Sequence, residues 1–132
     1  MAGALTHFII SILGFSILTF IFKNWKYGLA FAVGQLIPDL IRVGVTGLFN
    51  DTWSLGAIMT KALFWEMDFL HAYTTWVILF AVAFAIILGL YKFKKINKKQ
   101  FIEWFIAEVI FLIGTIAHLV IDYFIIETSY WI

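Results

Sequence analysis

The segment Thr115–Tyr123, which reads TIAHLVIDY, places the imidazole of His118 and the carboxylate of Asp122 one helical turn apart in an otherwise apolar stretch. Moving an ionisable side chain toward the centre of a bilayer costs about 2.5 to 3.5 kcal/mol on insertion scales. Both side chains are therefore candidates for a functional site, and the rest of the chain is expected to supply their partners.

The composition is that of an integral membrane protein. Of the 132 residues, 64% are hydrophobic and 13% are charged, and the mean hydropathy is +1.01, which lies far outside the range of soluble proteins. The net charge is +1 and the lysines are gathered in two short runs, so nothing supports nucleic-acid binding. Because cysteine is absent, disulfides and thiolate metal sites are excluded, and any metal is left to His, Asp and Glu.

Four apolar runs predict an all-α, integral membrane four-helix bundle in a single domain, residues 1–132. Each run is long enough to cross about 30 Å of hydrocarbon. We expect the helices at about 5–22, 28–48, 69–91 and 100–126, with a short interfacial helix at about 54–65. Pro38 lies inside the second run and frees a backbone carbonyl, which protein or water must satisfy.

The lysines predict the orientation in the membrane. Lys23 and Lys26 follow the first helix, and five lysines lie within residues 92–99 after the third. Short cytoplasmic loops carry an excess of Lys and Arg. We therefore expect a multi-pass cell-membrane protein with both lysine-rich loops in the cytoplasm, and with both termini and the 50–68 segment outside.

With this topology the ionisable groups of all four helices lie in the outer leaflet. Because the chain reverses direction at every helix, residues scattered by chance would not agree in depth in this way. Imidazole and carboxylate without thiolate suit zinc, iron or manganese, and the His-x3-Asp pair supplies two ligands to one centre. Helical periodicity places the polar residues of the first, second and fourth helices each on one face, so the faces can line one interior. The residues concerned are His7, Asp39, Arg42, Asp68, His71, His118 and Asp122.

Each candidate also has a purely structural interpretation. Asp39 and Arg42 can form an intramembrane salt bridge at i, i+3, and His118 and Asp122 can simply hydrogen-bond to each other. His7, near the terminus, can be a residue at the level of the lipid headgroups. Glu108 is expected in the inner half of the membrane, where it would serve in helix packing or pair with a lysine.

The order of these residues resembles that of a family of small membrane-bound metal-dependent hydrolases, found in bacterial inner membranes and loosely likened to zinc-dependent phospholipase C. The motifs of that family are Thr/Gly-His, Pro-Asp-x-Asp, His-Arg-Gly-x-Thr-His-Ser and Ser-His-x-x-x-Asp. Thr6-His7, Pro38-Asp39 and the His118–Asp122 turn match the first, second and fourth motifs. The third is reduced to Glu66 and His71 at the positions of its two histidines, and Ile41 replaces the second aspartate of Pro-Asp-x-Asp.

The resemblance implies hydrolysis of an ester or phosphoester, expected to be lipid-like, at an outward-facing site. A divalent metal, most readily zinc with manganese or iron as alternatives, would be bound, and the departures at Ile41 and in the third motif imply one metal fewer or none. Arg42 would hold a phosphate or lock Asp39, and Glu66 or Asp68 would act as ligand or general base. The expected metal ligands are His7, Asp39, His71, His118 and Asp122.

Two other functions remain open at this stage. The first is a non-catalytic four-helix membrane subunit or scaffold with a structural polar or metal site, in contact with membrane lipid and within a larger membrane complex. The second is proton or ion conduction, which intramembrane carboxylates and histidines also mark. Against conduction, the inner half of the bundle offers only Glu108 and Gln35.

Overall fold

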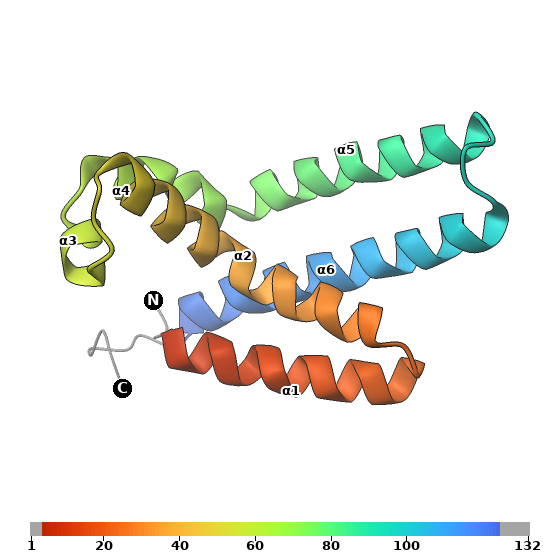
Figure 1. The fold of residues 1–132 in the computed structure, drawn as a ribbon, viewed down its shortest axis with the longest axis horizontal. Coiled ribbons are helices and arrows are strands. Elements are labelled where there is room, and N and C mark those ends of the chain that lie inside the picture. The colour runs from red at the N-terminus through yellow and green to blue at the C-terminus, as the bar shows by residue number, and fades with distance from the viewer. Residues whose placement is uncertain (1–3, 125–132) are drawn as a thin grey trace.

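Four long helices run back and forth and form the bundle in Figure 1: α1 (Ala4–Phe22), α2 (Trp25–Phe49), α5 (Tyr73–Lys92) and α6 (Lys98–Phe124). The structure is a computed structural model that describes residues 4–124. All four helices are long and apolar enough to cross a membrane. The predicted all-α four-helix fold is confirmed, while the expected continuation of the last helix to residue 126 lies outside the described residues.

Two of these helices begin earlier than predicted because capping residues precede them. Asn24 caps α2, and its Oδ1 accepts a hydrogen bond from the Lys26 N–H at 3.1 Å. Before α6, the Asn97 N–H donates to Gln100 Oε1 and the Gln100 N–H donates to Asn97 Oδ1, both at 2.9 Å. This reciprocal pair is a capping box, which satisfies N–H groups that the first helical turn leaves unpaired.

The connection between α2 and α5 is helical over more of its length than predicted. It forms α3 (Leu55–Met59), α4 (Ala62–Glu66) and the 3-10 helix η1 (Met67–His71). The long helix that follows begins at Tyr73 rather than near residue 69, because Ala72 is extended, with ψ 127°. The Trp76 Nε1–H reaches back to the Leu70 carbonyl at 2.6 Å and ties α5 to η1. His71 is thereby held at the end of η1, just outside the helix.

Close contact between α2 and α6 sets the centre of the bundle. A Cβ added at Gly34 would collide with the Phe111 carbonyl, and one added at Gly114 would collide with the Phe31 carbonyl. Small residues permit such close approach between membrane helices. In Figure 1, α1 lies beside α2 on one side, and α5 lies beyond α6 on the other.

An apolar cluster made of Leu70, Trp76 and Leu119 joins η1, α5 and α6, and Ile41 of α2 packs against it. Ile41 therefore belongs to this apolar cluster, whereas Asp39, two residues earlier, lies within ion-pair distance of two histidines. Residues two positions apart in a helix point in nearly opposite directions, which accounts for the difference.

Candidate metal centre

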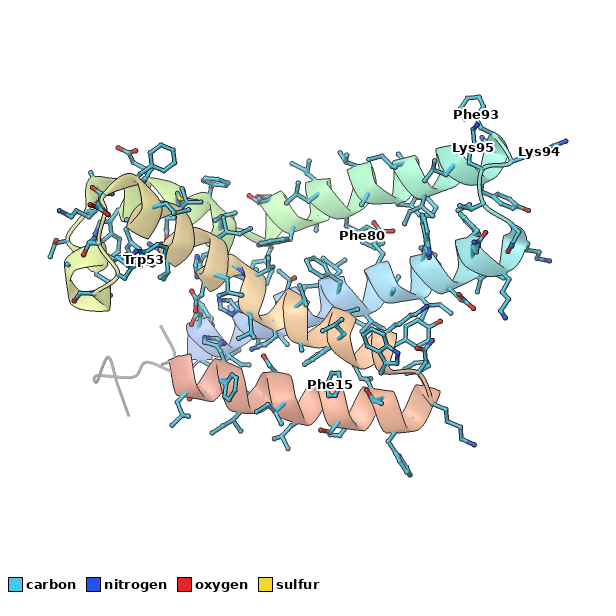
Figure 2. All side chains as sticks on the ribbon, viewed as in Figure 1. Phe15, Trp53, Phe80, Phe93, Lys94 and Lys95 are labelled. Atoms are coloured by element: carbon cyan, nitrogen blue, oxygen red, sulfur yellow. The ribbon has the colours of Figure 1, made fainter. Side chains whose placement is uncertain are left out.

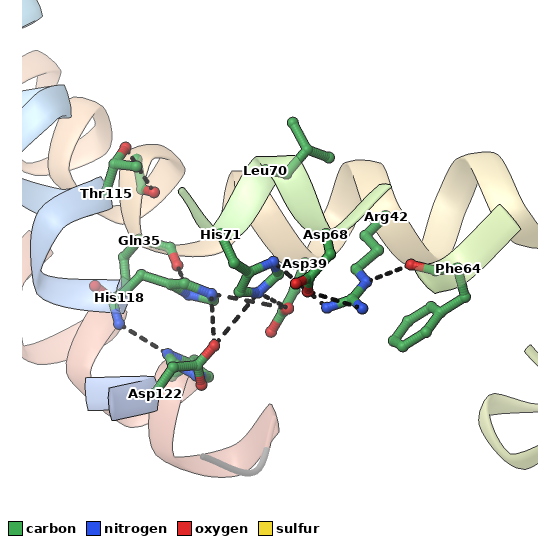
Figure 3. A network of polar contacts seen from close by, with 12 residues as sticks. Gln35, Asp39, Arg42, Phe64, Asp68, Leu70, His71, Thr115, His118 and Asp122 are labelled. Atoms are coloured by element: carbon green, nitrogen blue, oxygen red, sulfur yellow. Dashed lines mark hydrogen bonds and ion pairs between the residues drawn. The ribbon is translucent and has the colours of Figure 1, made fainter. Parts of the chain in front are cut away.

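Five side chains that the sequence nominates as metal ligands meet at the end of the bundle opposite the two lysine-rich turns (Figures 1 and 3). They come from α1, α2, η1 and α6, so segments far apart in the sequence build one cluster. Two subsets could each hold a metal ion, with ligand atoms within 4.8 Å of one another. The subsets are His7, His118 and Asp122, and Asp39, His71 and His118.

The imidazole of His118 is held in one orientation within the cluster. Its side chain is fully buried, and its Nδ1–H donates to the backbone carbonyl of Gln35 at 2.7 Å. The unprotonated Nε2 then faces Asp122 Oδ2 at 3.5 Å and Asp39 Oδ1 at 3.8 Å, and it makes no hydrogen bond with any described residue. A lone pair directed at two carboxylates is unfavourable unless a cation or a proton lies between them. Metal-binding histidines characteristically use their other nitrogen in this way, as a donor to a carbonyl.

His71 approaches the same two carboxylates from η1. Its Nε2 lies 3.4 Å from Asp39 Oδ1 and 3.3 Å from Asp122 Oδ2. Burial lowers the pKa of His71, but the interactions with Asp122 and Asp39 outweigh burial and raise this pKa to about 9. A metal ion would therefore have to displace the proton on Nε2 to bind there.

The distances between the histidine nitrogens and the carboxylate oxygens are close to those between neighbouring ligands of a zinc ion. A tetrahedral centre with bonds of about 2.0 to 2.1 Å separates its ligand atoms by about 3.3 to 3.4 Å. The four histidine–carboxylate distances here are 3.3, 3.4, 3.5 and 3.8 Å. Because Nδ1 of His118 is occupied by the Gln35 carbonyl, that imidazole can serve one ion only. His118 belongs to both groups that could hold a metal, so the cluster fits one metal ion at a time.

His7 supports this group from α1. The Gln35 side-chain amide donates to His7 Nδ1 at 3.0 Å, so His7 Nε2 carries the proton that it shares with Asp122 Oδ1 at 3.1 Å. The His7 ring also stacks on His118, with the ring centroids 4.0 Å apart. In this arrangement His7 orients both Asp122 and His118.

Arg42, predicted to hold a phosphate or lock Asp39, is buried and joins α2 to the segment that carries His71. Its Nε–H donates to the Phe64 carbonyl at 2.7 Å, and Nη2 pairs with Asp68 Oδ1 at 3.2 Å. Its Nη1 lies 3.5 Å from His71 Nδ1, and the guanidinium covers the Phe64 ring at 3.8 Å. Asp68 is 68% exposed beside it, and Glu66 is exposed at the end of α4. Neither acid belongs to the described groups that could hold a metal.

Gln35 and Thr115, which have no predicted role as ligand or catalytic group, also contribute to the site. Thr115 Oγ1–H, on α6, donates to the carbonyl of Gly34 at 3.1 Å. This is the carbonyl left free by Pro38, which has no N–H to offer it. Helical spacing does place both residues on the polar faces expected to line the interior, because Gln35 lies one turn before Asp39 and Thr115 one turn before His118.

Comparison of the chain with protein-family models, with curated proteins and with solved structures finds no significant match. The fold and the site together define a class: a protein of four candidate membrane helices with a buried cluster of histidines and aspartates that could hold a metal ion.

Proposed function

We propose that this protein is a membrane-embedded hydrolase that uses one divalent metal ion, zinc in the first place, to cleave an ester or phosphoester of a lipid-like molecule. The observation that carries the proposal is the approach of His71 and His118 to Asp39 and Asp122 at distances close to those of a tetrahedral zinc centre. The resemblance of the short motifs to membrane-bound metal-dependent hydrolases supports the same chemistry.

The residues of the cluster differ in exposure, and this suggests their roles. When bound, zinc supplies Lewis acidity toward water and toward an ester or phosphoryl oxygen at neutral pH. The Asp39 side chain is 32% exposed, against 10% for Asp122 and 13% for His71, so Asp39 is the carboxylate that an entering molecule meets. We propose that His71, His118 and Asp122 hold the ion and leave one position open for water, and that Asp39 acts as the general base, which takes a proton from the attacking water. Asp68 on the exposed side of Arg42 is the second candidate for that role.

The site is proposed to face the outer leaflet. The cluster lies at the end of the bundle opposite the turns that contain Lys23 and Lys94 (Figure 1), and the positive-inside rule places those turns in the cytoplasm. A lipid-like substrate would then reach Asp39 laterally, from the membrane in which the helices are embedded.

Metal analysis combined with hydrolysis assays tests the proposal. We expect purified protein to hold close to one zinc per chain and to cleave a p-nitrophenyl ester or phosphodiester. His118→Ala should lose both metal and activity, and Asp39→Asn should keep the metal and lose the activity. Glu103→Gln, a change near the other end of the same helix, should keep both. Protein without stoichiometric metal, or activity unaffected by His118→Ala, would refute the proposal.

The second candidate function is a non-catalytic membrane subunit with a structural metal. It is favoured by the number of protein atoms at the centre, because four protein ligands close a zinc site, whereas catalytic sites keep one position open. It predicts that Asp39→Asn loses metal and thermal stability, that no variant changes any hydrolysis, and that the protein purifies with a larger complex.

A further inference from the structure

A cavity of about 340 Å³ lies between α5 and α6, and none of the five candidate metal ligands lines it. Its walls are almost entirely apolar, and it is partly open at the surface. Phe80, labelled in Figure 2, lies between the two helices. Other lining residues are Trp76, Ala83 and Ile86 from α5, and Glu108 and Phe111 from α6.

Glu108 is the polar feature of this cavity. Both of its carboxyl oxygens are buried, and neither has a hydrogen-bond partner among residues 4–124. The backbone N–H of Phe84 is near enough to act on the carboxyl electrostatically, but its geometry is not that of a hydrogen bond. A buried carboxyl group without a partner is costly, in a protein interior or in a bilayer. Glu108 is therefore expected to lower the stability of the folded protein.

The depth of Glu108 in the membrane limits which groups can pair with its carboxyl oxygens. It lies midway between Lys98 and His118, about 15 Å along the helix axis from each. At this depth a bilayer offers acyl chains, which have neither a positive charge nor a hydrogen-bond donor. An acyl chain could fill the volume but would leave both oxygens of Glu108 unsatisfied.

The carboxylate of Glu108 and the aromatic residues that line the cavity together indicate which kind of molecule pairs with Glu108. One acid among the aromatic rings of Trp76, Phe80 and Phe111 complements an organic cation, because the carboxylate pairs with the charge and ring faces attract it further. Apolar groups on the same cation would fill the rest of the cavity. We propose that the α5–α6 cavity binds an apolar organic cation that enters from the membrane.

This binding is independent of the metal centre and is tested with tetraphenylphosphonium as the probe. Equilibrium dialysis of the full chain in detergent should show saturable binding of one ion per chain. Glu108→Gln, which keeps the shape of the side chain, should weaken binding about tenfold or more. Glu103→Gln is the matched control, since Glu103 lies on the same helix but pairs with Lys99 at the cytoplasmic end, and binding should be unchanged.

Two further measurements test cation binding in the cavity even if Glu108→Gln folds poorly. Ala83→Leu fills the cavity without altering the carboxyl and should also abolish saturable binding. Triphenylphosphine oxide, which is neutral, should bind the wild type and Glu108→Gln alike. The proposal is overturned if Glu108→Gln binds the cation as tightly as the wild type does, or if the wild type shows no saturable binding. Efficient disulfide formation between copies of Ala83→Cys in membranes would also overturn it, because a second copy of the chain would then occupy the cavity.

Discussion

Thr115 Oγ1–H on α6 lies 3.1 Å from the carbonyl oxygen of Gly34 on α2 and shares its proton with the carbonyl of Phe111, also at 3.1 Å; the Gly34 carbonyl is the one that Pro38 leaves without its helical donor. One turn along α6, His118 Nδ1–H donates to the next carbonyl of α2, that of Gln35. Two successive carbonyls of α2 thus accept hydrogen bonds from α6, and Pro38 leaves the first of them without its helical donor. The orientation of the His118 imidazole depends on the same helix pair that carries Asp39.

Replacing Thr115 by valine tests the first of these hydrogen bonds. The substitution keeps the shape of the side chain but leaves the Gly34 carbonyl without its donor, so we expect a loss of about 1 kcal/mol in the free energy of unfolding. Denaturation in mixed micelles measures it. Thr74→Val, at an exposed threonine of α5, is the control and should change stability little. Equal effects of the two variants would show that the Thr115 hydroxyl contributes nothing specific.

Replacing His7 should distinguish a supporting residue from a metal ligand. His7 Nε2–H is hydrogen-bonded to Asp122 Oδ1, so His7→Gln, which can still donate a hydrogen bond, should lower zinc affinity by about 10- to 100-fold, as is usual for residues that orient ligands. His118→Ala should remove stoichiometric zinc altogether. Titration with a competing chelator gives both affinities. If His7→Gln loses zinc as completely as His118→Ala, His7 is itself a ligand.

Replacing Arg42 should act on the metal centre through His71. Arg42 donates to the Phe64 carbonyl and pairs with Asp68, in the segment that ends at His71, and lysine cannot make these contacts in parallel because its charge is a single point. We expect Arg42→Lys to weaken zinc binding about 10-fold or more and Arg42→Met to weaken it further. Lys61→Met, which removes a cation from the same connecting segment, is the control. Unchanged zinc affinity in Arg42→Met would show that the Arg42 contacts do not position His71.

The absence of native cysteines makes the topology directly testable. Single cysteines at Ser54 and Lys95, both exposed and at opposite ends of the bundle, should differ in accessibility to a membrane-impermeant maleimide. We expect Ser54→Cys to react in intact cells and Lys95→Cys to react only after permeabilisation, because lysine-rich loops remain in the cytoplasm. The reverse pattern would place the metal centre on the cytoplasmic side.

Local sequence patterns predicted several features that the structure confirms. Hydropathy identified the four long helices, because a segment that spans hydrocarbon must be apolar over nearly its whole length. Helical periodicity and the alternation of direction brought His7, Asp39, His71, His118 and Asp122 to one end of the bundle, where the structure places them together.

Contacts between segments distant in sequence decided the rest. Only the packed structure shows that Arg42 donates a hydrogen bond to the α4–η1 segment and that His7 Nε2–H is hydrogen-bonded to Asp122. It also shows that Glu108 lies beside a cavity. The sequence by itself determined which side chains are too polar for lipid and at what depth they lie, since both follow from local hydropathy and helical rise. Tertiary structure alone decided which of them become partners, because a pair at 3 to 4 Å is set by the close packing of α2 and α6 at Gly34 and Gly114 and by the position of η1.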